Sequence, residues 1–205
     1  MAEYKTNNRV RLGLAPPPLQ QMALRGLKRG RNLFDAEIDR MIVLGIKPVN
    51  LCNGPWMTQV DRVLFDGEFF DLADADDDRG EKVFTMGVRS DTGLVDVAAW
   101  HPASGRLATW LEQGYALGEY LIKDHVDEDS PGLAVFRSPL DWLRADCRGI
   151  VILRKSFTRE VLAFVKVLLA ENEHHRVELR KLFLAGDLQP RILLRTPVNE
   201  PEAVA

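Results

Sequence analysis

The sequence predicts an α+β protein, because three stretches of the 205-residue chain differ in the spacing of their apolar residues. Residues 16–48 place apolar side chains at helical intervals, and residues 56–111 contain short alternating runs divided by turn sequences. Residues 112–195 combine short apolar runs with helical stretches. We therefore expect an N-terminal helical hairpin, a central antiparallel β-meander, and a C-terminal α/β segment with one long helix packed on the sheet.

The helical hairpin is predicted from two helical faces and their end signals. Met22, Ala23 and Leu27 recur at helical spacing, and Gly30 ends that helix. Asp35 is placed to cap a second helix. This second helix closes before Pro48, because proline disfavours helical geometry in the residue that precedes it.

The meander is predicted from five short runs with strand character. They cover residues 60–65, 68–72, 82–89, 94–100 and 106–110. Asp66-Gly67 joins the first two, and this dipeptide favours a tight hairpin because its backbone tolerates positive φ. Short strands joined by short turns indicate antiparallel pairing.

The next part of the chain is expected to hold a helix over residues 111–123 and a short strand over residues 133–136. Ser138-Pro139 is a helix start, because the serine caps exposed amides and the proline occupies a position whose N–H is unused. The apolar run at residues 150–153 predicts a strand that is buried on both faces.

The long helix is expected from residue 158 to residue 184. Val161, Val165 and Leu168 form its apolar stripe. A last strand is expected at residues 191–195.

Length and composition predict one domain over residues 16–195, with a flexible arm at 1–15 and a tail at 196–205. A chain of this size can bury a sufficient core without disulfides, so we interpret Cys52 and Cys147 as small apolar residues in a reduced compartment. Neither a secretory signal nor an apolar run of membrane-spanning length occurs. These features predict a soluble, cytoplasmic protein with no membrane partner.

The net charge of −3 is unevenly distributed along the chain. Residues 1–31 hold seven basic residues and one acidic residue (+6), residues 61–81 hold two basic and nine acidic residues (−7), and residues 154–195 hold nine basic and five acidic residues (+4). This asymmetry is typical of a surface for a charged partner. The alternative is that the three regions neutralise one another in the fold.

The sequence contains no glycine-rich phosphate loop, G-x-S-x-G or H-E-x-x-H motif of catalytic or cofactor sites. The acidic run at residues 74–80 departs from a calcium loop, because its glycine comes seventh and Thr85 stands where a bidentate carboxylate is required. Glu171 and His174 have the E-x-x-H spacing of di-iron bundles, but such sites need two copies. We expect a polar patch where this helix meets solvent, and neither a metal nor a cofactor.

Two groups of residues are candidates for contact with a partner. Cationic side chains gather at the end of the first helix, where they can neutralise phosphates: Arg25, Lys28, Arg29 and Arg31. The alternative is a solvated helix end whose charges suit the helix dipole. An aromatic and basic patch results if three sheet residues face outward: Trp100, Arg106 and Trp110. Packing in the core is the alternative for the two tryptophans.

The function predicted from these features is that of a non-catalytic binding or accessory protein that acts through protein–protein contacts. One alternative is a nucleic-acid-binding regulator that uses the basic N-terminal helix. The other is an enzyme, for which the polar residues to consider are Asp96, His101, Asp141, His174 and His175.

Overall fold

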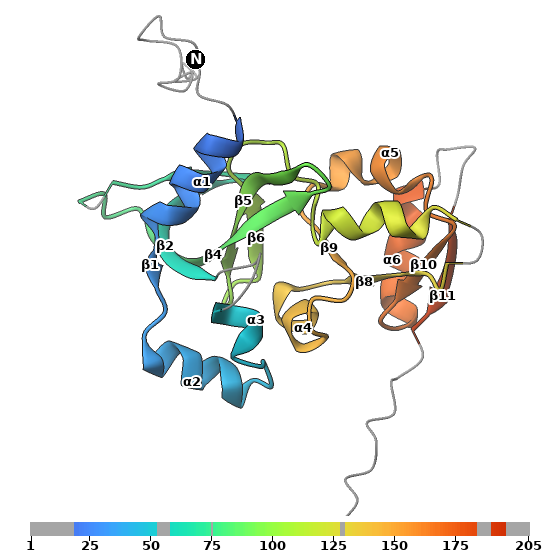
Figure 1. Ribbon diagram of the computed structural model, residues 1–205, viewed down its shortest axis with the longest axis horizontal. Helices are drawn as coiled ribbons and strands as arrows, with labels where there is room; N and C mark the ends of the chain where they lie inside the picture. Colours follow the sequence, from blue (N-terminus) through green and yellow to red (C-terminus); the bar gives the residue numbers. More distant parts are fainter. Residues whose placement is uncertain (1–18, 53–57, 75, 128–129, 184–189, 196–205) are drawn as a thin grey trace, which may run out of the picture.

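The computed structural model describes residues 19–52, 58–74, 76–127, 130–183 and 190–195 (Figure 1). It contains both helices and strands, which confirms the α+β class. The arm expected at residues 1–15 and the tail expected at residues 196–205 lie outside the described residues. Within the described ranges, no helix is long and apolar enough to cross a bilayer.

The central part of the chain forms a closed five-stranded barrel. Its strands are β2 (Gln59–Asp66), β3 (Phe69–Leu72), β4 (Glu81–Ser90), β5 (Gly93–His101) and β6 (Arg106–Thr109). The strand order is β2-β3-β6-β5-β4, and β4 pairs again with β2. All five predicted strands are confirmed, but the antiparallel meander is wrong, because β3 pairs in parallel with β6 rather than with β4. The pairing of β2 with β4 closes the sheet and leaves fewer unpaired edges.

The barrel interior is apolar, and one helix covers it. Val63, Val83 and Val97 are buried inside, in a cluster that also contains Ala23 and Leu27 of α1 (Leu19–Arg29). The helix therefore packs its apolar face on the barrel, as its periodicity requires.

The N-terminal helices do not form the expected hairpin. The two-residue strand β1 (Arg31–Asn32) separates α1 from α2 (Asp35–Val43) and pairs with β2. Met41 of α2 packs with Leu51 of α3 (Val49–Cys52) in a different cluster from α1. The hairpin prediction is wrong because strand pairing at residues 31–32 leads the chain away from α1.

The C-terminal part is a second sheet, with the order β11-β10-β8-β9-β7. Its strands are β7 (Ala116–Leu117), β8 (Leu133–Phe136), β9 (Ile150–Ile152), β10 (Val167–Ala170) and β11 (Arg191–Leu194). The pairings are parallel except that of β7 with β9. Its helical segments are η2 (Glu119–His125), α4 (Pro139–Arg144), η3 (Lys155–Phe157), α5 (Thr158–Leu162) and α6 (Glu173–Phe183).

The two faces of this sheet pack on different neighbours, as strand alternation requires. Val135 and Ile150 belong to the cluster that contains residues of α5 and α6. Phe136 and Val151 belong to the cluster that contains Trp100 of the barrel. The sheet therefore lies between its own helices and the barrel, with α4 near the junction (Figure 1).

Two predicted helices are wrong. Residues 158–184 form α5, β10 and α6 rather than one long helix, because residues 167–170 pair with β8 and β11 as a central strand. Residues 111–123 form β7 and most of the 3₁₀ helix η2. The strands near residues 133, 150 and 191 are confirmed, as is the helix start at Ser138, whose hydroxyl accepts the Asp141 N–H at 3.2 Å.

Candidate functional site

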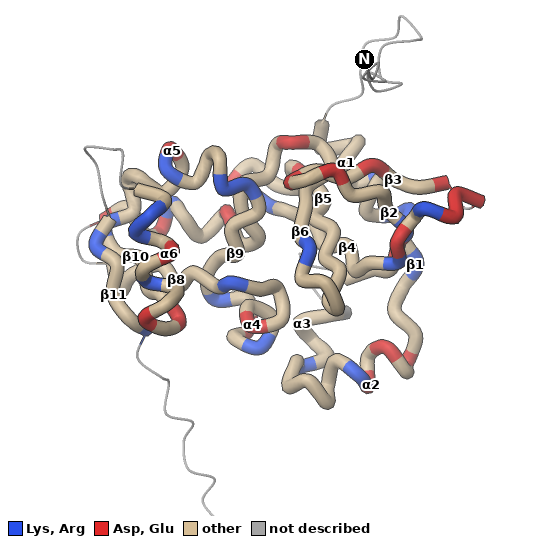
Figure 2. Tube along the Cα trace, turned by 180° about the vertical axis from the view of Figure 1, so that it is seen from behind, with Lys and Arg blue, Asp and Glu red and all other residues tan. Residues whose placement is uncertain are grey.

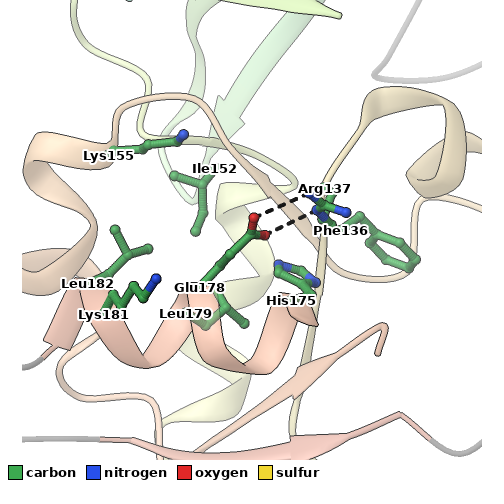
Figure 3. Close-up of a pocket in the computed structure, with 9 residues that line it drawn as sticks. All are labelled: Phe136, Arg137, Ile152, Lys155, His175, Glu178, Leu179, Lys181 and Leu182. Atoms are coloured by element: carbon green, nitrogen blue, oxygen red, sulfur yellow. Dashed lines mark hydrogen bonds and ion pairs between the residues drawn. The ribbon is translucent and has the colours of Figure 1, made fainter. Parts of the chain in front are cut away.

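A pocket of about 420 Å³ lies at the carboxyl ends of the parallel strands (Figure 3). We call it the carboxyl-edge pocket; its lining residues are Phe136, Arg137, Ile152, Lys155, His175, Glu178, Leu179, Lys181 and Leu182. Phe136 ends β8 and Ile152 ends β9, whereas the last five residues come from α6.

The connectivity of the sheet explains why a pocket forms at this edge. The chain leaves β8 through α4 toward β9, and it leaves the adjacent strand β10 through α6 toward β11 on the opposite side. Connections that diverge from neighbouring parallel strands leave a crevice outside their carboxyl ends, which is the usual ligand position in open α/β sheets.

The floor of the pocket is apolar. Ile152 reaches it from the sheet, and Leu179 and Leu182 reach it from α6. Leu179 and Leu182 are spaced three residues apart and therefore share one helical face. An apolar floor with a few polar groups on its rim is typical of ligand pockets.

An ion pair occupies one side of the rim. The Arg137 guanidinium contacts both carboxylate oxygens of Glu178, with Nε at 3.1 Å from Oε2 and Nη2 at 3.2 Å from Oε1 (Figure 3). The imidazole Nε2 of His174 lies 3.1 Å from the same Glu178 Oε1. About half of the Arg137 and Glu178 side-chain surface remains exposed (47% and 42%), so water screens this pair.

His175 is the buried polar group of the pocket, with 4% of its surface exposed. Nδ1 of His175 lies 3.4 Å from the Glu171 backbone N–H and 3.6 Å from Glu171 Oε2, so Glu171 occupies this edge of the ring. The Asn172 side chain caps the start of α6 by accepting the His175 backbone N–H at 2.9 Å. Burial lowers the pKa of His175 and raises the pKa of Glu171. The expected solvent-facing patch is confirmed for His174, whose side chain is 73% exposed, but it is wrong for Glu171, which is 15% exposed, and its neighbour His175 packs inward.

Lys155 and Lys181 extend the rim on the side away from Arg137 (Figure 3). Within the described part of the chain, neither ammonium group forms an ion pair. Glu68 of the barrel fixes the segment after β9 by accepting the Lys155 backbone N–H at 2.9 Å. The barrel therefore helps to position one cation of the pocket.

The catalytic candidates named from the sequence are not brought together. Asp96 is buried and accepts backbone N–H groups of residues 97, 110, 111, 113 and 114, and His101 contacts Ser104 in a turn of the barrel. Asp141 contacts Ser138 and Arg144 on α4, whereas His174 and His175 lie on α6. Among them, only His175 lines the carboxyl-edge pocket.

The four basic candidates, of which three lie on α1 and Arg31 lies on β1, divide into two pairs. Arg25 and Lys28 are exposed. Arg29 donates to the Ala73 carbonyl and lies 3.9 Å from Asp61, and Arg31 pairs with Glu37 at 2.6 Å. The hydrogen bond from Arg31 holds the pKa of Glu37 well below its usual range. Figure 2 shows basic and acidic residues interleaved around β1 and β2.

The tryptophans take the core position that was the alternative to an outward-facing aromatic patch. Trp100 is only 4% exposed and packs in the core shared by the barrel and the second sheet. Trp110 lies against Gly26 of α1, whereas Arg106 pairs with Glu81 and lies over the Phe65 ring at 4.6 Å. The two tryptophans contact different elements because side chains alternate between the faces of a sheet and α1 covers one of these faces.

Sequence reasoning missed four charged residues of the pocket: Arg137, Lys155, Glu178 and Lys181. Arg137 directly follows the predicted strand at residues 133–136, and Lys155 closely follows the one at residues 150–153. Polar residues after parallel strands are a signal for a site, but the parallel pairing was not predicted. Among the described residues, no group of three or more His, Cys, Asp or Glu is arranged to hold a metal ion.

Comparison with protein-family models, curated proteins and solved structures finds no match for this chain.

Proposed function

We propose that this protein is a non-catalytic binding protein that contacts a protein partner through the carboxyl-edge pocket. The observation that carries this proposal is the combination of an apolar floor and a cationic rim at the point where the β8 and β10 connections diverge. An apolar floor gives binding free energy, and charged rim groups select the partner.

The composition of the pocket supports binding rather than catalysis. Its lining residues in the described chain include no serine, threonine or cysteine to act as a nucleophile. Glu178 is held in an ion pair with Arg137. His175 is the one titratable group of the pocket that is buried, and its contacts within the described chain are with Glu171 and Asn172.

The experiment compares partner capture by two variants of α6. Leu182→Glu places a charge on the pocket floor, whereas Val177→Glu makes the same type of change at a position of the same helix that does not line the pocket. Tagged wild-type protein and Val177→Glu are expected to capture the same component from a lysate of the source organism, and Leu182→Glu is expected to lose it.

A charge reversal of the exposed Lys181 gives a second test that does not depend on the packing of Leu182. Lys181→Glu is expected to lose the same component, since it changes the sign of one rim charge. Equal capture by wild-type protein, Leu182→Glu and Lys181→Glu would contradict the proposal.

Nucleic-acid binding by the N-terminal segment is a second candidate, favoured by one observation. A groove of about 570 Å³ beside α1 is lined by four cations, Arg29, Arg31, Arg62 and Lys82, together with Asp61. Arg25→Ala combined with Lys28→Ala removes exposed charge from α1, the helix whose Arg29 lines this groove. A gel shift with single- and double-stranded oligonucleotides is expected to lose binding in this variant but not in Arg159→Ala on α5. Binding that is unchanged by the double substitution would remove this candidate.

A further inference from the structure

The proposed function leaves open the chemistry that the rim of the carboxyl-edge pocket selects. We propose that this rim binds a phosphate-monoester group, and that Glu178 holds its position beside Arg137 until the phosphate displaces it. This inference rests on the proposed function and deepens it by naming the group that is recognised.

The geometry of the Arg137 guanidinium suits a phosphate group. Its guanidinium already binds two oxygens of one anionic group, those of Glu178, at 3.1 and 3.2 Å. Two oxygens of a phosphate match the same fork of donors, because guanidinium groups bind carboxylate and phosphate in the same bidentate way. Glu178 is 42% exposed, so its side chain can turn into solvent at little cost.

His175 of α6 brings a second polar group to the pocket. His175 is buried, and both the backbone N–H and the carboxylate of Glu171 face its Nδ1, so Nε2 is the ring nitrogen left for a ligand. No hydrogen bond or ion pair joins Nε2 to another described residue, and this nitrogen donates in the tautomer whose Nδ1 accepts the Glu171 N–H. Because His175 lines the pocket, a ligand oxygen would supply the missing acceptor.

The charges of the pocket-lining residues favour a ligand with two negative charges. The pocket-lining residues carry three cations, Arg137, Lys155 and Lys181, against the single carboxylate of Glu178. A surplus of two positive charges is matched by a phosphate monoester, which carries nearly two negative charges at neutral pH. A carboxylate would neutralise only one of them. Glu171 lies behind His175 and is held by the Arg137 backbone N–H at 3.3 Å, so it does not line the rim.

The size of the site favours a ligand that is larger than a phosphate group. The volume of about 420 Å³ exceeds what one phosphate fills, and the remaining wall is the apolar surface of Ile152, Leu179 and Leu182. The phosphate is therefore expected to be attached to a larger body that contacts this surface.

The experiment measures the dissociation constant of inorganic phosphate at about pH 7.5, where the dianion predominates. NMR titration of the full chain follows the backbone amides of Arg137 and His175 and the Arg137 Nε–H. Glu178→Gln is expected to tighten phosphate binding by about tenfold, because it removes the internal anion, and Arg137→Gln is expected to weaken it by about tenfold or more.

Matched controls come from α6. Glu173→Gln and Arg176→Gln break an ion pair of 2.6 Å that lies outside the pocket, and they are expected to change the dissociation constant by less than about twofold. The absence of a saturable shift, or weaker binding by Glu178→Gln than by wild-type protein, would overturn the proposal. Equal effects of the pocket and control substitutions would overturn it as well.

Two further ligands distinguish the source of the phosphate. A blocked phosphoserine tripeptide and glucose 6-phosphate are expected to compete with inorganic phosphate for the same amides. Tighter binding of the tripeptide assigns the group to a phosphorylated protein partner, and tighter binding of the sugar phosphate assigns it to a small molecule. Failure of both to compete would overturn the phosphate site.

The two proposals fail separately. If phosphate does not bind but Leu182→Glu still loses the captured component, the result supports the binding function and contradicts the phosphate proposal. If phosphate binds with the expected effects of Arg137→Gln and Glu178→Gln while capture is unchanged by the pocket variants, the result supports the phosphate site and contradicts the proposal of a protein partner.

Discussion

The substitution Asp96→Asn tests how the barrel is connected to the second sheet. The Asp96 side chain is fully buried, and its carboxylate accepts five backbone N–H groups. The donors to Oδ1 belong to Val97 (2.7 Å), Trp110 (3.2 Å) and Leu111 (2.7 Å), and the donors to Oδ2 belong to Gln113 (2.9 Å) and Gly114 (3.0 Å). One side chain therefore fixes the turn between β6 and β7.

The size of the effect follows from the number of donors. Asparagine keeps one oxygen, and its amide group must face at least two N–H donors, those of Gln113 and Gly114. Two lost hydrogen bonds to a charged acceptor cost about 3–6 kcal/mol. Part of this loss is offset, because burial raises the pKa of Asp96 and the uncharged amide avoids the cost of burying a charge. After this offset is subtracted from the cost of the lost hydrogen bonds, we expect a net loss of about 3 kcal/mol in the free energy of unfolding.

Urea unfolding and thermal denaturation measure this loss. A loss of about 3 kcal/mol corresponds to a decrease in Tm of about 6–12 °C for a chain of this length. Asp91→Asn, in the exposed turn between β4 and β5, is the control and is expected to stay within about 0.5 kcal/mol of wild-type protein. A loss of less than about 1 kcal/mol for Asp96→Asn would refute the role assigned to the five donors.

Three other single residues test the packing and titration of the fold. Gly26→Ala places its Cβ 2.2 Å from Cζ3 of Trp110, so urea unfolding is expected to show a free energy of unfolding lower by about 1–3 kcal/mol, despite the better helix propensity of alanine. A higher free energy of unfolding would contradict this expectation. Burial lowers the pKa of His175, so the unfolded chain binds the proton first and the free energy of unfolding falls as the pH drops below the ordinary value of 6.5. His175→Asn is expected to make the free energy of unfolding less dependent on pH in that range. An unchanged dependence in urea unfolding at several pH values would contradict this expectation. Burial raises the pKa of the Cys147 thiol to about 12, so iodoacetamide at about pH 8 is expected to alkylate this thiol only after the protein unfolds. Peptide mapping measures the alkylation. Rapid modification of Cys147 in the native protein would contradict its burial.

The strands of the barrel were predictable because local signals define them. Each strand is a short run between turn sequences, such as Asp66-Gly67, where Gly67 has a φ of 62°. The closure of the barrel was not predictable, because it depends on residues 59–63 pairing with residues 81–85 across an intervening strand and an acidic loop. Turn chemistry fixes neighbouring strands, but it carries no information about this more distant pairing.

The error at residues 158–184 has a different cause. Val161, Val165 and Leu168 have the spacing of a helical face, yet Leu168 is the centre of a buried parallel strand. A short apolar run cannot be assigned to a helix or a strand from periodicity alone, and pairing with β8 and β11 decides it here. The missed strand also concealed the site, because the carboxyl-edge pocket is defined by where β8 and β10 end.

The charge layout connects the fold to the proposed site. The basic N-terminal segment and the acidic segment at residues 61–81 partly neutralise each other, since Arg29 contacts Asp61 and the Ala73 carbonyl, while Arg31 is neutralised nearby by Glu37. The C-terminal surplus is not neutralised in the same way, because Lys155 and Lys181 face the carboxyl-edge pocket with no ion pair in the described chain. Unpaired cations beside an apolar floor favour a ligand that brings both negative charge and apolar surface, which is the reason for placing recognition at this edge rather than on the barrel.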